Sequence, residues 1–217
     1  MKVTTDACVF GSWVPVPSGD VLDIGTGTGL LSLMIVQRSE CIIDAVELDE
    51  ESYLQASENV QQSSWSDRIK VIHADVRKFP PDRRYDLIIC NPPFFRNHLK
   101  SPSSAERNKA RHADDLSHEE LIGIAIQLLN YPEGRLAVLL PEFNAAEMIL
   151  LAAGVKLFPE ATLTIVDRQG LPAISKALVF SFHGGKPVKD ETLIIKNKQG
   201  NYTSDFISLL KDFYLHL

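Results

Sequence analysis

The segment Asn91-Pro92-Pro93-Phe94 carries the most specific chemistry in this sequence. Prolines have no backbone N–H, so they rigidify the turn and leave its carbonyls as acceptors beside the side-chain amide of Asn91. Two acceptors that hold both N–H groups of an aminopurine or amide nitrogen favour a localised lone pair, which can attack an electrophile. Phe94 and Phe95 offer a flat apolar surface on which a base can stack, worth about 1 to 3 kcal/mol. The motif therefore predicts a turn that activates an exocyclic or amide nitrogen, and a plain strand-ending turn is the alternative.

A run of glycines precedes that motif, in Asp23-Ile24-Gly25-Thr26-Gly27-Thr28-Gly29. Glycine lets the backbone turn tightly and approach a ligand without a Cβ in the way. The dinucleotide fingerprint G-x-G-x-x-G needs a third glycine where this chain has Leu30, so nicotinamide and flavin cofactors fit poorly. A Walker phosphate loop is excluded because no Gly-Lys-Ser/Thr follows. The run indicates a ligand-binding turn, with a simple glycine-rich turn as the alternative.

Two carboxylates stand at positions that suit a nucleoside. Glu47 lies about 20 residues beyond the glycines, where an acidic side chain can accept hydrogen bonds from both hydroxyls of a ribose. Asp75 is placed to accept a hydrogen bond from an adenine amino group. Taken singly, Glu47 is explained as well by a solvated charge at a strand end, and Asp75 by an aspartate that caps a helix or stabilises a turn. Because the glycines and the two carboxylates end three successive predicted strands, one nucleoside ligand explains them together.

The elements that must position these residues alternate between short apolar runs and helical patterns, which is typical of βαβ units and a mostly parallel sheet. The predicted strands are 20–24, 42–47, 70–73, 85–90, 135–140, 162–166 and 177–182, and the predicted helices are 30–38, 50–62, 116–129 and 144–153. Ser117 and Glu120 predict a capping box at the start of the helix over 116–129. We expect the tail, extended over 193–196 and helical over 204–215, to pack on this core as an appendage.

Composition bounds the class of protein. The chain has 217 residues, 45% apolar and 23% charged, which is the composition of a soluble globular protein with one domain as the default. Its apolar runs are far shorter than the roughly 18 residues that a membrane span needs, and 1–9 lacks a basic-then-apolar leader. We therefore expect a cytoplasmic protein without a membrane partner. Cys8, Cys41 and Cys90 lack the paired spacing of a zinc or redox site, so we interpret them as reduced apolar residues and expect no metal.

Charge is distributed unevenly along the chain. The net charge of −6 argues against a protein that coats nucleic acid electrostatically. The stretch 40–58 carries seven Asp and Glu residues and no Lys or Arg, whereas 96–112 carries Arg96, Lys100, Arg107, Lys109 and Arg111 against Glu106 alone. This basic stretch lies in 92–115, an irregular segment too long for a simple connection, and such segments are usually functional or disordered. A polyanionic partner that touches only this stretch fits the pattern.

Together, Asp23 to Gly29, Glu47, Asp75 and the Asn91 motif resemble the class I S-adenosylmethionine-dependent methyltransferases, in the branch that methylates exocyclic or amide nitrogens. The segments 2–6, 10–13, 110–112, 201–202 and 213–215 extend the resemblance to the bacterial methyltransferases that act on adenine N6 beside the anticodon of a valine tRNA. Family members usually have an additional stretch before the segment 2–6. The resemblance implies a Rossmann-like α/β fold with a seven-stranded, mostly parallel sheet and helices on both faces. It also implies one domain, with a cofactor-closing segment over 1–19, a core over 20–183 and an appendage over 184–217.

The resemblance assigns roles to single residues. The cofactor S-adenosylmethionine, which leaves as S-adenosylhomocysteine, is expected to contact Thr5, Asp23, Gly25, Thr26, Gly27, Gly29, Glu47, Leu48, Asp75, Val76 and Asn91. Asn91, Pro92, Pro93 and Phe94 are expected to be catalytic. RNA is expected to contact Phe94, onto which the target adenine turns, and Arg107, Lys109 and Arg111, which meet phosphates. A solvated surface loop is the alternative for those three cations.

Several functions share these motifs. An adenine-N6 methyltransferase acting on tRNA, as a monomer, is the first interpretation, and one acting on ribosomal RNA is the next. A glutamine-amide methyltransferase poses the same chemical problem, but enzymes of that type carry a helical substrate domain before the sheet and only about 20 residues precede Val21 here. A small-molecule N-methyltransferase and a non-catalytic, cofactor-binding RNA module are the remaining alternatives. The intact Asn91 motif argues against the last, because binding alone does not need two aimed acceptors.

Overall fold

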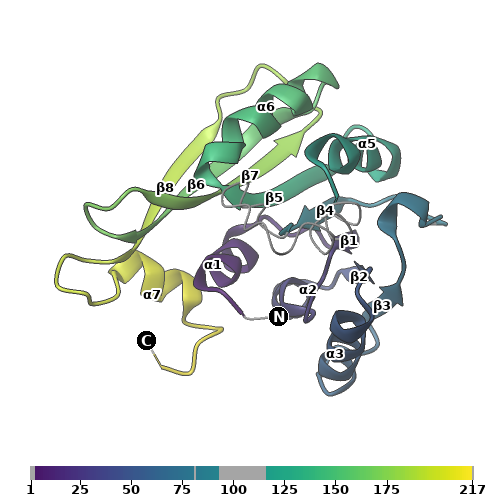
Figure 1. Ribbon diagram of the computed structural model, residues 1–217, viewed down its shortest axis with the longest axis horizontal. Helices are drawn as coiled ribbons and strands as arrows, with labels where there is room; N and C mark the ends of the chain where they lie inside the picture. Colours follow the sequence, from purple (N-terminus) through teal and green to yellow (C-terminus); the bar gives the residue numbers. More distant parts are fainter. Residues whose placement is uncertain (1–2, 81, 93–115, 217) are drawn as a thin grey trace, which may run out of the picture.

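The computed structural model describes residues 3–80, 82–92 and 116–216, whose strands form one sheet in the order β3-β2-β1-β4-β5-β7-β6-β8 (Figure 1). The strands are β1 (Asp20–Ile24), β2 (Ile42–Glu47), β3 (Ile69–His73), β4 (Leu87–Cys90), β5 (Arg135–Pro141), β6 (Phe158–Arg168), β7 (Ala173–Ser181) and β8 (Lys189–Lys196). The helices are α1 (Thr5–Trp13), α2 (Leu30–Arg38), α3 (Glu50–Gln61), α5 (His118–Leu128), α6 (Ala145–Gly154) and α7 (Ser204–Leu210). The 3-10 turns η1 (Val76–Lys78) and η3 (Glu142–Asn144) follow β3 and β5.

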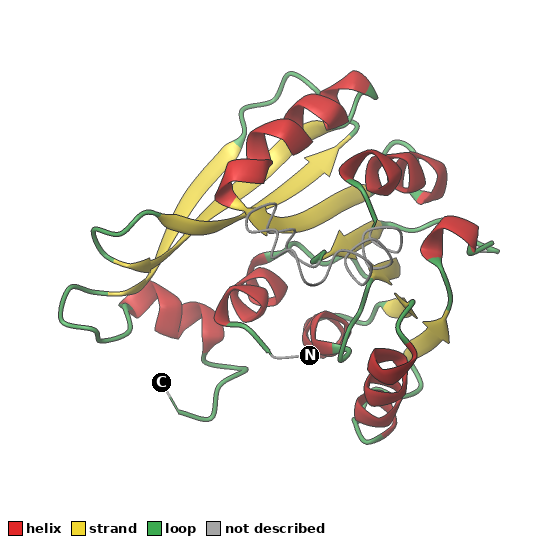
Figure 2. Cartoon of the chain, viewed as in Figure 1, coloured by secondary structure: helices red, strands yellow, loops and turns green. Residues whose placement is uncertain are grey.

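Helices cover both faces of the sheet (Figure 2). On one face, α5 and α6 pack over a buried cluster that includes Leu22 and Ile88, and on the other, α1, α2 and α7 pack over a cluster that includes Val21 and Ile89. Successive residues of β1 and β4 thus point into opposite clusters, as the pleat of a strand requires. Burial on both sides is the reason why the central strands are continuous apolar runs. The predicted α/β fold with helices on both faces is confirmed.

The order of the strands reverses between β1 and β4. Strand β1 pairs in parallel with β2 on one side and with β4 on the other, and Ile24 stands opposite both Val46 and Cys90. The residues that follow Ile24 and Cys90 therefore lie side by side at the edge formed by the carboxyl ends of the parallel strands, here called the carboxyl edge. Open α/β sheets bind their ligands beyond this edge, at the point where strand order reverses.

The sheet has eight strands within the described residues, so the predicted number of seven is wrong by one. The additional strand is β8, which pairs in parallel with β6 from Ala161 opposite Lys189 to Arg168 opposite Lys196. An edge strand needs apolar residues on one face only, and Leu193 and Ile195 supply that face of β8. Because β8 begins with polar residues, the hydrophobic pattern did not reveal its full length. The extended part of the tail is therefore a strand of the sheet, where an appendage packed on the core was predicted.

Periodicity did not predict helix α1, because nearly every side of this helix is buried. Its residues from Ala7 to Ser12 are all buried, and Phe10 has no exposed surface. A helix that buries every side has no apolar stripe, and the periodicity of 3.6 residues disappears. The predicted capping box of α5, in contrast, is present, with Ser117 Oγ accepting from the Glu120 backbone and Glu120 Oε2 accepting from the Ser117 backbone.

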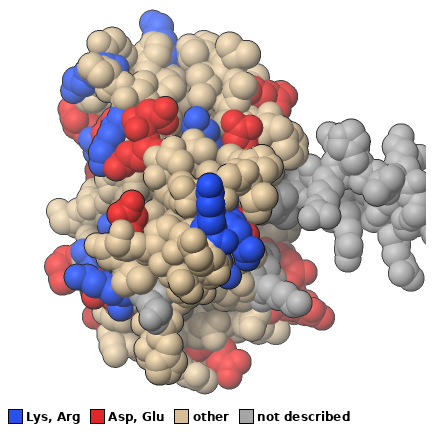
Figure 3. Space-filling model, turned by 90° about the vertical axis from the view of Figure 1, so that its left-hand side faces the viewer, with Lys and Arg blue, Asp and Glu red and all other residues tan. Residues whose placement is uncertain are grey.

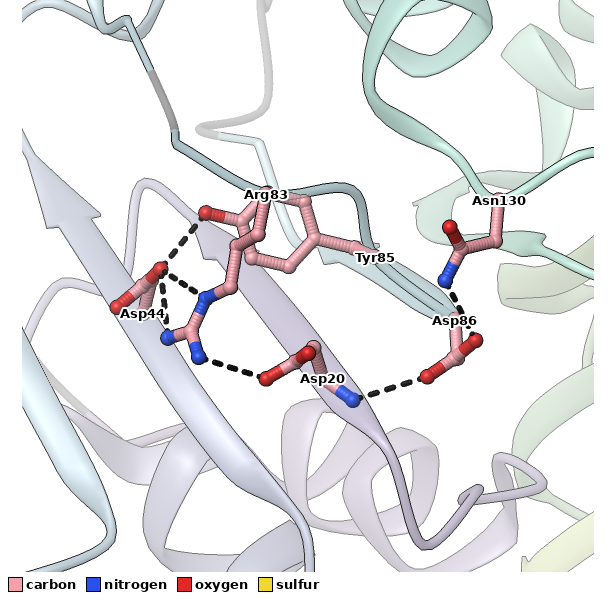
Figure 4. Close-up of polar contacts among 6 residues, drawn as sticks. All are labelled: Asp20, Asp44, Arg83, Tyr85, Asp86 and Asn130. Carbon is pink, nitrogen blue, oxygen red and sulfur yellow. Dashed lines mark hydrogen bonds and ion pairs between the residues drawn. The ribbon is translucent and has the colours of Figure 1, made fainter.

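A polar network joins β1, β2 and β4 at the edge opposite the carboxyl edge (Figure 4). Arg83 donates through Nη1 to Asp20 at 2.7 Å and through Nη2 and Nε to Asp44 Oδ2 at 2.9 and 3.2 Å. The hydroxyl of Tyr85 donates to the same oxygen at 2.7 Å. Burial is the first cause that raises the pKa of Tyr85, and Asp44 is the second, so the phenol remains a donor at neutral pH. The network therefore fixes the register of β2 and β4 relative to β1.

Asp86 completes this network from the start of β4. Its two carboxylate oxygens accept from the Asp20 backbone at 3.0 Å and from Asn130 Nδ2 at 2.7 Å. A Cβ on Gly19 would lie 1.8 Å from Asp86 Oδ2, so this approach requires glycine. The amino ends of β1 and β4 are therefore joined directly, which sets where their carboxyl ends lie.

In the part of the chain that the structure describes, no helix is long and apolar enough to cross a bilayer. Over the same residues, no three His, Cys, Asp or Glu side chains come together as a metal site would need. Cys8, Cys41 and Cys90 are free and buried, and their burial agrees with their interpretation as apolar residues.

Candidate functional site

The glycine run forms a tight loop between β1 and α2. Gly25, Gly27 and Gly29 have φ angles of 67°, 61° and 81°, the left-handed region that favours glycine. The backbone amides of Gly25 and Thr26 donate to the Val46 carbonyl at 2.9 and 3.1 Å, which joins the loop to the end of β2. Among the described residues, a Cβ built on Gly25 would meet nothing within 4 Å. The loop is therefore rigidly placed and has open space over Gly25 through which a ligand can approach the backbone.

Asp23 is fully buried beneath this loop. Its Oδ2 accepts from Thr26 Oγ1 at 2.6 Å and from Ser32 Oγ, in the first turn of α2, at 2.7 Å. Its Oδ1 is buried without a hydrogen-bond partner among the described residues. Burial, opposed by these hydrogen bonds and assisted by Glu47, raises the pKa of Asp23 from 3.8 to about 6. A buried acceptor without a partner is costly in a native fold, so Oδ1 marks a place where a ligand can donate a hydrogen bond.

The raised pKa of Asp23 predicts how stability depends on pH. Between about pH 4 and pH 6 the folded state holds a proton on Asp23 that the unfolded state has lost, so the free energy of unfolding falls as pH rises through this window. The contribution is about 2 to 3 kcal/mol. Urea unfolding of wild type and Asp23→Asn at pH 4, 5, 6 and 7 measures it, because the difference between the two proteins must change by this amount. Parallel profiles would contradict the assignment.

Glu47 ends β2 and is held by backbone amides. Its Oε2 accepts from Gly27 at 2.8 Å, and its Oε1 accepts from Leu48 at 2.8 Å and from Asp49 at 2.9 Å. A carboxylate has about four acceptor positions, so these three bonds leave about one position for a ligand. Glu47 thus shapes the glycine loop as well as facing it, a role that its position in the sequence did not indicate.

Glu47→Ala should weaken cofactor binding by about 1 to 3 kcal/mol, because a ribose would lose its acceptor and the Gly27 amide its partner. Calorimetric titration with S-adenosylmethionine measures the change in Kd. Asp49→Ala is the matched control, since it removes a carboxylate two residues further on that caps α3 through Ser52. An unchanged Kd for Glu47→Ala, or an equal change in both variants, would remove Glu47 from cofactor binding.

Asp75 follows β3 and caps η1. Its Oδ1 accepts from the Arg77 backbone at 3.0 Å and from Arg77 Nε at 2.8 Å, which is also an ion pair. The bond from the Arg77 side chain is the largest cause that lowers the pKa of Asp75, so the group is ionised at neutral pH. Val76 begins η1 directly after it. A contact of Asp75 and Val76 with an adenine stays a prediction.

Asn91 follows β4 at the carboxyl edge, beside the residue that opens the glycine loop. Its Oδ1 is buried and has no hydrogen-bond partner among the described residues. The preceding Cys90 is also buried, and burial together with Asp23 and Glu47 raises the pKa of its thiol. Asn91 therefore lies next to the place where Asp23, Glu47 and the glycines meet. Asp23 Oδ1 and Asn91 Oδ1 are thus two buried acceptors without partners among the described residues, and they belong to neighbouring strand ends.

The structure brings most of the predicted site residues to the carboxyl ends of β1, β2, β3 and β4. Pro92 is described beside Asn91, whereas Pro93, Phe94, Arg107, Lys109 and Arg111 lie outside the described residues. Thr5 lies apart in the sequence, in the first turn of α1, where its side chain interacts with Tyr214. Its contact with the cofactor stays a prediction.

Two features of the site were missed by the sequence analysis. Ser32 holds Asp23, and nothing in its helical context distinguishes it from any other polar residue of α2. His73 contacts the Leu48 carbonyl through Nε2 at 3.0 Å and stacks on Tyr53 with ring centroids 5.0 Å apart. This pair stands beside Glu47 and braces the end of β2. Neither feature could be predicted from the sequence, because each depends on a contact between separate elements.

Comparisons with known proteins agree with this geometry. A family model described as "Methyltransferase small domain" matches residues 8–157. The tRNA1(Val) (adenine(37)-N6)-methyltransferase of Trichodesmium erythraeum is 43% identical, over 99% of this chain and 91% of that protein. The protein of the same name from Bacteroides fragilis is 37% identical, over 100% of this chain and 92% of its own length.

Solved structures support the fold. A predicted O-methyltransferase from Agrobacterium tumefaciens superimposes with a TM-score of 0.72 at 18% identity, covering 94% of this chain and 95% of that one. A putative RNA methyltransferase from Pyrococcus horikoshii has a TM-score of 0.60 at 21% identity, covering 81% and 84%. The family match, the relatives that span nearly the whole chain and the site at the carboxyl edge agree, and we conclude that this chain belongs to the tRNA1(Val) (adenine(37)-N6)-methyltransferase family.

Proposed function

We propose that this protein transfers a methyl group from S-adenosylmethionine to the exocyclic N6 of an adenine in tRNA, next to the anticodon of valine tRNA. The observation that carries the proposal is the buried Oδ1 of Asn91, an acceptor without a partner among the described residues, which follows β4 beside the glycine loop. The names of the relatives supply the substrate, since they act on adenine 37 of tRNA1(Val).

The residues around the glycine loop fit S-adenosylmethionine. The open space over Gly25 admits close approach, and Asp23 Oδ1 offers a buried acceptor beneath it. Glu47 would hold the ribose, and Asp75 with Val76 would lie beside the adenine of the cofactor. When bound, S-adenosylmethionine supplies an electrophilic methyl group. The protein contributes the position of that group relative to Asn91.

Asn91 and Pro92 prepare the attacking nitrogen. The amino group of adenine is a weak nucleophile because its lone pair is delocalised into the ring. Asn91 Oδ1 would accept from one N–H and the Pro92 carbonyl from the other, and both bonds strengthen as the nitrogen becomes pyramidal in the transition state. The nitrogen becomes acidic only after the new N–C bond has formed, so its proton leaves afterwards and no general base has to act before the attack.

The experiment that tests this function compares nucleosides from wild-type and gene-deletion cells by mass spectrometry. We expect loss of N6-methyladenosine from tRNA and its return when the purified protein is incubated with that tRNA and S-adenosylmethionine. Loss from ribosomal RNA with unchanged tRNA would assign the enzyme to ribosomal RNA. Unchanged RNA together with a methylated glutamine in a protein would assign it to amide methylation.

Arg107, Lys109 and Arg111 are proposed phosphate contacts. Each contact that is lost should reduce the slope of log affinity against log salt concentration by about 0.7 to 0.9, so a triple alanine variant should lose about 2. Fluorescence anisotropy with labelled tRNA at several salt concentrations measures the slope, and calorimetry checks that affinity for S-adenosylmethionine is unchanged. Equal slopes for wild type and the triple variant would assign these side chains to solvent.

A further inference from the structure

A cationic surface is built by residues that lie far apart in the sequence. Arg168 ends β6, Lys196 ends β8, and Lys198 follows in the turn to α7. Arg168 and Lys196 are direct partners in the parallel pairing of β6 with β8, and the Gln169 amide donates to the Lys196 carbonyl at 2.9 Å. We call Arg168, Lys196 and Lys198 the β6–β8 cationic surface.

None of these cations has an acidic partner in the part of the chain that the structure describes. Within the described residues, no carboxylate oxygen lies within 4.0 Å of the charged nitrogens of Arg168, Lys196 or Lys198, whereas Arg83, Arg135 and Lys189 all form ion pairs. The sequence neighbour Asp167 points to the opposite face of the sheet because side chains alternate along a strand. Unpaired positive charge in a chain of net charge −6 indicates a partner that supplies negative charge.

The surface is held in place by local structure. Gly200 has a φ of +89°, and the turn from 197 to 201 is closed by the Gly200 amide on the Asn197 carbonyl and by the Asn201 amide on Asn197 Oδ1. Arg168 Nη2 would lie 4.0 Å from a Cβ on Gly200, so its guanidinium stands over this turn.

Tyr202 orients the middle cation. Lys196 Nζ lies 5.4 Å from the centroid of the Tyr202 ring, which in turn stacks on the buried Phe206 at 4.7 Å. A lysine held over an aromatic face loses less rotational freedom when it meets an anion.

The surface rises beyond the carboxyl edge on the same side as Asn91. Strands β4, β5, β6 and β8 all run in one direction. Cys90 pairs with Val138 of β5, and a single residue of β7 pairs with both Val138 and Thr162 of β6, so these positions lie side by side across the sheet. Arg168 stands six residues further along β6, which is about 20 Å at the rise of a strand, and three strand spacings, about 14 Å, to the side. The ends of β6 and β8 project past β4 in Figure 1, and Figure 3, which looks onto this end, shows Lys and Arg side chains near its centre.

From this placement we infer that the β6–β8 cationic surface binds the sugar-phosphate backbone of the RNA whose target base lies at Asn91. The inference rests on the proposed function. Phosphate contacts carry no base specificity and instead position a nucleic acid, which matches a group of cations set apart from the reacting atoms. Arg168 and Lys198 meet phosphates directly, and Lys196 does so while Tyr202 holds it.

The test compares Arg168→Ala/Lys198→Ala with the matched control Lys186→Ala/Lys189→Ala. The control removes two exposed lysines at the other end of β8. With tRNA as the probe, we expect the first variant to raise Kd and KM about tenfold at physiological salt and to reduce the salt slope by about 1.4 to 1.8, while kcat and the Kd of S-adenosylmethionine stay within twofold. The control should match wild type in every measurement.

An unchanged slope and KM in the first variant, or an equal loss in the control, would overturn the inference. Failure of the proposed function gives a different result, because wild type would then leave tRNA unmethylated whatever its affinity. Lys198→Glu serves as a second variant, since an exposed charge reversal leaves the core intact and should weaken RNA binding more than Lys198→Ala.

Discussion

Asn91→Ala should lower kcat by about 10²- to 10³-fold, the loss typical of one transition-state hydrogen bond. Asn91 Oδ1 is buried without a partner among the described residues, so none of them uses its acceptor capacity and a ligand can. The bond to the amino group strengthens only as the nitrogen becomes pyramidal, and removing it therefore affects turnover more than ground-state binding. Single-turnover methylation of tRNA measures the effect.

Asn91→Asp is the informative companion variant. Its carboxylate has the size of the amide and can still accept from an N–H group, so it should retain more activity than Asn91→Ala. The Kd of S-adenosylmethionine should change much less than kcat in both variants, which separates chemistry from cofactor binding. Near-normal turnover of Asn91→Ala would show that the turn does not activate the nitrogen.

Arg83→Met should destabilise the fold by about 3 to 5 kcal/mol, because it leaves the Asp44 carboxylate with the Tyr85 hydroxyl as its remaining partner in the network. The Asp44 side chain is only 6% exposed, and a buried charge without its counter-ion is strongly unfavourable. The Arg83 side chain is 31% exposed, so solvent screening places the expected loss at the lower end of this range. Urea unfolding at pH 7 measures the change in midpoint at constant m.

Arg84→Met controls for the loss of an adjacent arginine. Arg84 donates to the carbonyls of Gln127 and Leu129 and has a smaller expected cost. Arg83→Met/Asp44→Asn should be less destabilised than the sum of its single variants, since neutralising Asp44 removes the unpaired charge. A loss below about 1 kcal/mol for Arg83→Met would show that water replaces the guanidinium at Asp44.

Local sequence was enough to predict the core of this fold and the edge that carries the site. Buried parallel strands are continuous apolar runs, so β1, β2 and β5 were located to within a residue or so. The glycines predicted a tight turn between β1 and α2, and the structure shows that it is left-handed. Because parallel strands end at one edge, the order of Gly25, Glu47, Asp75 and Asn91 along the chain already implied their proximity. Phe94 and Arg111 lie outside the described residues, so their roles stay predictions.

Tertiary structure alone decided how these residues are engaged. Glu47 was predicted as a free acceptor for a ribose, yet three backbone amides bind it, because the loops after β1 and β2 meet at its side chain. The eighth strand, β8, was not predicted because its first residues are polar. It forms nonetheless, because its pairing with β6 compensates for the weak hydrophobic pattern. That same pairing sets Arg168 beside Lys196, 28 residues further along the chain. The sequence by itself determined which strands end in glycines and polar side chains, because that information is local. The cationic surface depends on strand order, which only the packing of the whole sheet decides.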